Sequence, residues 1–165
     1  MPGVVKRKYD HESFLISKNI SQSLKKISEI LPQYYSRQDL VNAYIKYYPF
    51  EWQKLAERQQ NYKQKDIFLI SNKKKKRYNP KSEYGFFFSV PKVKHLLSEG
   101  MKSKHSINFD EESVSIKRND FEHKRMMVNE KTTSRIAEAK INSQNVTPTY
   151  LKYYIKAYHK KRNNH

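Results

Sequence analysis

Five consecutive cations, Lys73 to Arg77, limit the fold of this chain more than any other stretch of its sequence. Neighbouring like charges repel one another and stay in water, so the run cannot enter a hydrophobic core. Apolar segments lie on both sides of it, at residues 67–71 and 85–90. The run must therefore form an internal loop between two ordered segments.

Positive charge also dominates the whole composition. The 165 residues include 34 Lys or Arg against 16 Asp or Glu, a formal net charge of +18, and residues 67–105 hold ten of these cations and two of these acids. A surface of this kind attracts polyanions. We therefore expect nucleic acid as the partner, DNA before RNA. A general drift of the composition toward lysine is the alternative explanation.

Several classes of protein are excluded by the same composition. The chain has no cysteine, which rules out disulfides and thiolate-bound metals, and its three glycines are too few for a glycine-rich phosphate loop. Its six histidines lack metal-binding spacing, so neither a metal nor another cofactor is expected. No apolar stretch approaches the roughly 20 residues of a membrane span, and the start of the chain lacks the apolar stretch of a secretory signal. We expect an intracellular protein of the cytoplasm, nucleoid or nucleus, without a membrane partner.

Three helices are predicted in the first half of the chain. Apolar side chains recur at every third or fourth position over residues 19–31, which predicts an amphipathic helix there. The pattern Ser36-x-x-Asp39 is typical of a capped helix start and predicts a second helix that ends at Tyr48. Pro49 suits the first position of a third helix, which we expect to run to about Lys65.

After the third predicted helix, the apolar residues no longer recur at helical spacing and instead form short continuous runs. Residues 67–71 and 85–90 are predicted as two strands of a hairpin with the basic run at its tip. Further along, the pattern predicts in turn a helix, a second hairpin and two helices, over 92–101, 107–116, 121–141 and 147 onward. The predicted fold class is α+β and mainly helical: a three-helix unit with a basic-tipped β-hairpin, followed by a helical C-terminal region. The predicted division is a basic arm over 1–18, that unit over 19–91 and an accessory region over 92–165.

In the order of these elements, residues 19–90 resemble a winged helix-turn-helix DNA-binding domain. In that family the third helix enters the major groove and the hairpin loop contacts the DNA backbone or minor groove. The resemblance implies base contacts from the third helix, where Arg suits guanine and Asn or Gln suits adenine, and phosphate contacts from the loop. The residues concerned are Lys54, Arg58, Gln60, Asn61 and Gln64 in the helix, and Lys73, Lys74, Lys75, Lys76, Arg77 and Lys81 in the loop. The alternative is an ordinary solvated helix face beside a basic run that is a flexible surface loop or a localisation signal.

A second basic feature lies near the end of the chain. Lys152, Lys156 and Lys160 are spaced by four, which places them on one stripe of the predicted last helix. They are candidates for further contacts with a nucleic-acid backbone. The alternative is that these cations lie there because the dipole of a helix attracts positive charge to its C-terminal end.

The sequence therefore predicts a non-enzymatic nucleic-acid-binding protein with a regulatory role. A second hypothesis is a basic subunit or inhibitor that docks on a nucleoprotein complex. A third is a Mg²⁺-dependent nuclease, because Asp110, Glu122 and Lys124 have an Asp…Glu-x-Lys pattern that resembles the restriction-type nuclease core. There two carboxylates hold the metal and the lysine positions the attacking water.

Overall fold

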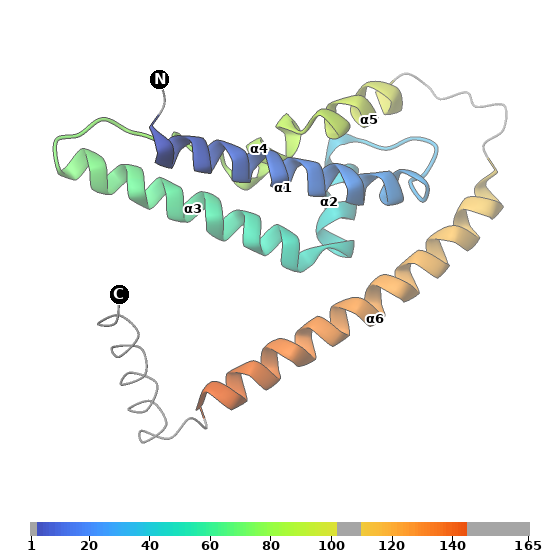
Figure 1. Cartoon of the computed structure of the whole chain (residues 1–165). Helices are drawn as coiled ribbons and strands as arrows, with labels where there is room; N and C mark the ends of the chain where they lie inside the picture. The colour runs from blue at the N-terminus through green and yellow to red at the C-terminus, as the bar shows by residue number, and fades with distance from the viewer. Residues whose placement is uncertain (1–2, 102–109, 145–165) are drawn as a thin grey trace. The chain divides into compact units, whose positions relative to one another are not determined.

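The computed structural model describes residues 3–101 and 110–144, and these residues form six helices (Figure 1). In chain order they are α1 (Val4–Ser28), α2 (Arg37–Tyr47), α3 (Pro49–Ser71), α4 (Glu83–Ser89), α5 (Pro91–Met101) and α6 (Glu111–Gln144). The contacts divide the chain into two compact units, with the boundary between Met126 and Met127 inside α6. The predicted division at 18/19 and 91/92 stays a prediction.

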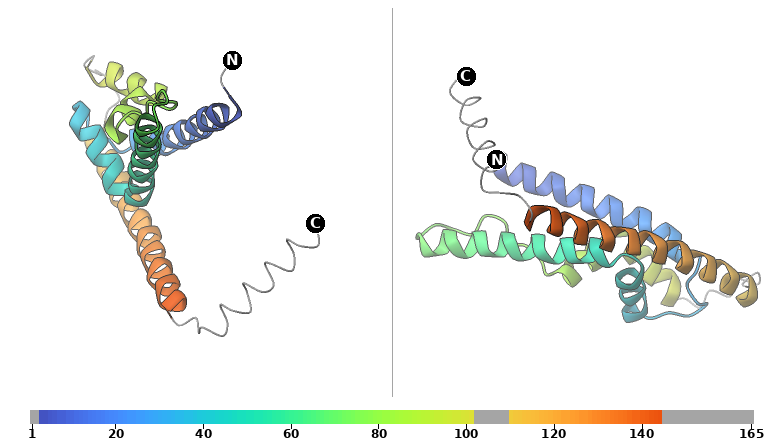
Figure 2. Two further views of the ribbon diagram at one scale, coloured as in Figure 1. Left: turned by 90° about the vertical axis from the view of Figure 1, so that its left-hand side faces the viewer. Right: turned by 90° about the horizontal axis from the view of Figure 1, so that it is seen from below.

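The core of the first unit lies where α1, α2, α4 and α5 meet. Leu24 of α1, Leu40 of α2, Phe87 of α4 and Val93 of α5 are completely buried in one hydrophobic cluster. The helices α4 and α5 lie on the same side of α3, as Figures 1 and 2 show. The apolar residues predicted to be buried from Ile20 to Leu31 are all buried, but the predicted bounds 19–31 are wrong, because α1 begins at Val4 and ends at Ser28.

The predicted start of the second helix is confirmed in detail. The Asp39 N–H donates to Ser36 Oγ at 3.1 Å, and the Ser36 N–H donates to Asp39 Oδ2 at 2.8 Å. The hydrogen bond from the Ser36 backbone lowers the pKa of Asp39, with the Ser36 side chain adding to the effect. This capping box pairs two backbone N–H groups that would otherwise lack partners.

We expect Ser36→Ala to lower the free energy of unfolding by about 1 kcal/mol, because the first turn of α2 loses its side-chain acceptor. Urea unfolding followed by circular dichroism measures the change. Ser28→Ala is the matched control, since the Ser28 hydroxyl donates only to the Lys25 carbonyl one turn back in its own helix. Equal losses for the two variants would contradict the capping role.

The predicted α+β class is wrong for the described residues, because they contain no strand and no hairpin. Residues 67–71 are the last turns of α3, which continues past the predicted end at Lys65. A helix that has already formed gains one hydrogen bond for each residue it adds, and this outweighs the strand preference of a short apolar run. The segment 85–90 falls mainly in α4, whose start is capped by the Gly85 N–H donating to Ser82 Oγ at 3.1 Å.

The second predicted hairpin is also wrong where the structure describes it. Val114 and Ile116 belong to α6, and the segment 102–109 lies outside the described residues. The helices predicted over 92–101 and 121–141 are confirmed as α5 and as part of α6. The helix predicted from residue 147 lies outside the described residues. Within the described ranges, no helix combines the length and the apolar character needed to cross a bilayer.

Polar side chains hold the first turns of α6 within the first unit. Lys46 Nζ and Tyr47 Oη each donate to Glu122 Oε1 at 2.9 Å. Arg118 Nε donates to the Ile30 carbonyl at 2.9 Å, and Arg125 Nε to the Tyr47 carbonyl at 2.9 Å. These bonds tie α6 to α2 and to the end of α1.

We expect the protein to lose stability as the pH rises from about 10 toward 12. Burial raises the pKa of Tyr47 to about 12, and the hydrogen bond to Glu122 and its charge add to this. An unfolded tyrosine ionises near pH 10, so above that pH the unfolded chain releases a proton that the folded chain retains. The expected loss from Tyr47 is about 1–3 kcal/mol at pH 12. Urea unfolding of the wild type and Tyr47→Phe at pH 8 and 11.5 measures it, and an identical pH dependence for both would contradict it.

Candidate functional site

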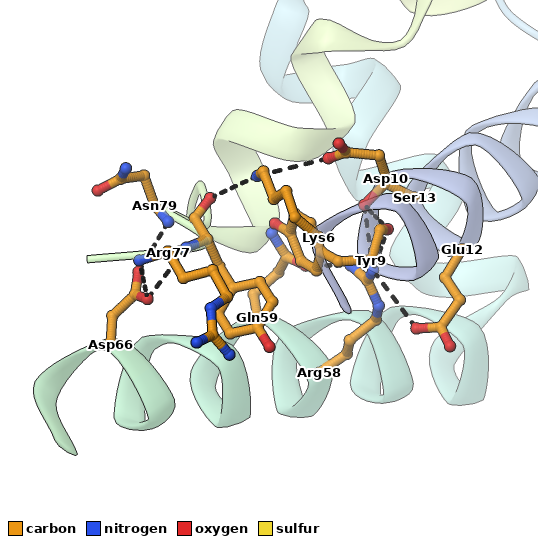
Figure 3. Close-up of polar contacts among 11 residues, drawn as sticks. Lys6, Tyr9, Asp10, Glu12, Ser13, Arg58, Gln59, Asp66, Arg77 and Asn79 are labelled. Atoms are coloured by element: carbon orange, nitrogen blue, oxygen red, sulfur yellow. Dashed lines mark hydrogen bonds and ion pairs between the residues drawn. The ribbon is translucent and has the colours of Figure 1, made fainter. Parts of the chain in front are cut away.

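The loop over residues 72–82, called the basic loop below, is fixed to α3 by one buried carboxylate. Asp66 is 3% exposed, and it accepts the backbone N–H groups of Arg77 at 2.8 Å, Tyr78 at 3.0 Å and Asn79 at 2.7 Å (Figure 3). Lys73 and Asn79 adopt positive φ angles of 59° and 47°, at two points of the loop. The loop is therefore a shaped structure around an acid of α3.

The pKa of Asp66 shows which effect controls its charge. Burial raises the pKa, but the hydrogen bonds from Tyr78, Arg77 and Asn79, with the charge of Lys76, lower it by more. The net pKa lies below the ordinary value of 3.8. Asp66 is therefore ionised at neutral pH, and both of its oxygens are held by the basic loop.

The second half of the same loop has further anchors, at Tyr78 and Lys81. Gln59 of α3 is 3% exposed, and its Nε2 donates to the Lys81 carbonyl at 2.8 Å. Lys6 Nζ of α1 donates to the Tyr78 carbonyl at 3.2 Å. The buried ring of Tyr78 contacts the rings of Tyr9 and Tyr62, with centroids at 5.1 and 4.7 Å. The loop backbone is held by α1 and α3 together.

A cavity of about 420 Å³ opens between the basic loop and α3. The charged and amide side chains that line it are three lysines, three amides and two acids: Lys63, Lys76, Lys81, Gln59, Gln60, Asn79, Asp66 and Glu83. They come from α3, the basic loop and the first turn of α4. The cavity presents three ammonium groups and two carboxylates beside its amides, and this excess of one cation suits an anionic ligand with hydrogen-bonding groups.

Arg58, predicted to contact bases, joins α1 to α3 within the fold. Its Nη2 donates to the Tyr9 carbonyl at 3.1 Å and to Ser13 Oγ at 3.0 Å, and it lies 3.8 Å from Glu12 Oε2 (Figure 3). Its guanidinium also lies over the rings of Tyr9 and Tyr62, at 4.7 and 4.9 Å. The Nη groups and the face of the guanidinium are therefore engaged within the fold, whereas Arg58 Nε is buried without a hydrogen-bond partner.

The other predicted contact residues are divided between the cavity and the open surface. Gln60, Lys76 and Lys81 line the cavity. The exposed residues outside its lining are Lys54, Asn61, Gln64, Lys73, Lys74, Lys75 and Arg77. Lys152, Lys156 and Lys160 lie outside the described residues. Sequence reasoning missed Lys63, Asp66 and Asn79, although one acid placed shortly before a basic run is a signal that the run folds back.

The three nuclease candidates all take part in contacts that build α6. Asp110 Oδ1 accepts the Glu112 N–H at 3.1 Å, and Lys124 Nζ lies 2.9 Å from Asp120 Oδ2. The hydrogen bond from Lys46, followed by that from Tyr47, lowers the pKa of Glu122. Over residues 3–101 and 110–144, no group of three His, Asp or Glu side chains is placed to hold a metal ion.

The chain is 41% identical over 161 residues to a protein of Cytobacillus dafuensis that is named "Putative cyclic ADP-D-ribose synthase TIR2". The match covers 98% of this chain and 42% of the relative, so the chain spans about two fifths of the length of that protein. No family model and no solved structure matches the chain.

This relative corrects several predictions. The winged helix-turn-helix resemblance is wrong, because the related protein bears the name of a cyclic ADP-D-ribose synthase and the described residues lack the hairpin that would be the wing. The predictions of non-enzymatic DNA binding, of transcription regulation and of no enzymatic activity are wrong for the same reason, since a synthase is an enzyme. Nucleic acid as a partner and the predicted contact residues stay predictions.

Proposed function

We propose that this chain is the helical part of an intracellular enzyme that makes cyclic ADP-ribose from an ADP-ribosyl donor such as NAD. One observation carries the proposal: 41% identity over 98% of the chain to a protein named as such a synthase. Because the relative extends well beyond the matched region, the proposal concerns an enzyme to which this chain contributes one part.

The chemistry sets what such an enzyme must do. The bond between the ribose C1′ and the nicotinamide nitrogen breaks, and nicotinamide leaves with the bonding electron pair. A nitrogen of the adenine in the same molecule forms the new bond to C1′, and one proton is released. The enzyme must bring the two ends of the dinucleotide together and exclude water, because water would give the linear product instead.

The described residues suit binding of the donor. The cavity beside the basic loop offers lysines to phosphate groups and amides to a base. Asp66 accepts hydrogen bonds from three backbone N–H groups, and Glu122 accepts them from the Lys46 and Tyr47 side chains, so both acids already stabilise the fold. We therefore assign to this chain the holding of the nucleotide and the helical frame of the enzyme.

A chimera tests the proposed function. This chain replaces the matching 161 residues of the Cytobacillus dafuensis protein, and the product formed from NAD is measured by liquid chromatography with mass spectrometry. We expect the chimera to make cyclic ADP-ribose, and the same protein without the region to make at least about tenfold less, as is typical when substrate positioning is lost. An otherwise identical chimera with Phe87→Ala, which disrupts the core, is the matched control. Unchanged product formation after deletion, or an inactive chimera beside an active parent, would overturn the proposal.

A further inference from the structure

We infer that the cavity between α3 and the basic loop binds the pyrophosphate of an ADP-ribosyl nucleotide. The position of the site follows from the cavity, and the choice of nucleotide rests on the proposed function. The ligand chemistry is a pyrophosphate with an adenosine attached, which the donor, the linear product and the cyclic product share.

Three lysines reach this cavity from separate points of the backbone. Lys63 comes from α3, whereas Lys76 and Lys81 come from the middle and the end of the basic loop. Lys63 and Lys81 form no ion pair within the described residues. An ammonium group offers three donors, and phosphate oxygens accept charge-assisted hydrogen bonds. Three such groups around one opening suit two linked phosphates better than one.

Two acids, Asp66 and Glu83, also line the cavity, so the three lysines leave its lining with one net positive charge. Asp66 lines the same cavity, but three backbone N–H groups point at its carboxylate. These N–H groups offset much of its negative charge locally. They also fix the backbone from which Lys76 extends. The basic loop is therefore ordered before a ligand arrives, which reduces the entropy lost on binding.

The size and the amides of the cavity favour a small nucleotide over a polymer. Its volume of about 420 Å³ is within the range of small-molecule sites, roughly 300–1,000 Å³. Gln60 and Asn79 lie on its wall, and side-chain amides of this kind can form paired hydrogen bonds with the edge of adenine. The open cations Lys74 and Lys75 lie outside the wall and offer only long-range attraction.

Calorimetric titration of the chain measures the affinity directly, without turnover. The probes are ADP-ribose, NAD and cyclic ADP-ribose, compared with inorganic pyrophosphate and a short DNA duplex at the same ionic strength. We expect the ADP-ribosyl nucleotides to bind at least about tenfold more tightly than inorganic pyrophosphate, because the amides add contacts to adenine. The order of affinity among the three nucleotides shows whether the site serves the donor or a product.

Two double variants of equal charge provide the decisive comparison. We expect Lys63→Gln with Lys81→Gln to weaken binding of ADP-ribose about tenfold or more, because two phosphate contacts are lost. Lys74→Gln with Lys75→Gln removes the same charge outside the cavity and should change the affinity less than about threefold. Circular dichroism verifies that both variants retain their helices.

Three results would overturn the inference: no binding of ADP-ribosyl nucleotides, equal weakening by the two double variants, or equal affinity for the DNA duplex. The titration and the chimera assay fail independently of each other. If binding depends on Lys63 and Lys81 but the chimera is inactive, the nucleotide site is supported and the proposed synthase function is contradicted. If the chimera is active but the cavity binds no nucleotide, the proposed synthase function is supported and the nucleotide site is contradicted.

Discussion

Phe87→Ala should lower the free energy of unfolding of the first unit by about 3–5 kcal/mol. The Phe87 side chain is completely buried in the cluster that joins the core helices. Its ring lies 5.2 Å from that of Tyr44 and 5.9 Å from that of Trp52, centroid to centroid. Truncation removes a large buried apolar surface. It also leaves a cavity between α2, α3 and α4, because these packed helices can move only partly into the space that the ring occupied.

Urea unfolding measures this loss, and Trp52, the single tryptophan of the chain, supplies a fluorescence signal next to the site. Tyr84→Ala is the matched control, because Tyr84 lies on the same helix α4 and contacts the same indole, yet is 45% exposed. We expect the control to lose less than about 1.5 kcal/mol. Similar losses for the two variants would show that Phe87 does not anchor α4 in the core.

The part of the fold that local signals determine was predictable. Ser36 and Asp39 form a capping box because four neighbouring residues contain everything that the motif needs. Pro49 begins α3 because its ring already has the helical φ angle and it lacks the N–H that would be unpaired there. The buried stripe of α1 follows from helical spacing alone.

The hairpin was mispredicted because short apolar runs carry little information about period. Phe86, Phe87 and Phe88 match the composition of a strand, whereas the cue for a helix is the single hydroxyl of Ser82 that caps its start. Residues 67–71 have no boundary signal between them and the preceding helix. These residues are helical because the preceding helix extends into them. A pattern that assigns each short segment by itself does not include this effect.

The candidate site was predictable in its charge and not in its shape. The basic run indicates an anionic partner, and three of the predicted contact residues, Gln60, Lys76 and Lys81, line one cavity. Lys63 joins them only because Asp66 draws the basic loop back over α3. Net charge does not distinguish a nucleotide from a nucleic acid, since both carry phosphate. A cavity of limited volume does, and it exists only in the folded chain.

Asp66→Asn should lower the free energy of unfolding by about 2–3 kcal/mol at pH 7 and should free the basic loop from α3. An amide oxygen can still accept from Arg77 and Tyr78, which share Oδ1, but the NH2 group then faces the Asn79 N–H, so at least one buried donor loses its partner. Urea unfolding measures the stability, and amide hydrogen exchange at residues 77–79 measures the release of the loop. Asp10→Asn is the control, because Asp10 forms an exposed i,i+4 pair with Lys6 at 3.4 Å, and we expect less than about 0.5 kcal/mol from it.

The pH dependence of the same variant tests whether the charge of Asp66 matters. Because the pKa of Asp66 is lowered in the folded protein, its stabilisation is complete above the ordinary value of 3.8 and is lost as the pH falls through the folded pKa. The stability difference between wild type and Asp66→Asn should therefore be full at pH 7 and should shrink below about pH 4. A constant difference across this range would mean that Asp66 acts through its shape alone. Fast exchange of the N–H groups at 77–79 in the wild type would contradict the anchored loop, and with it the fixed position of Lys76 at the cavity.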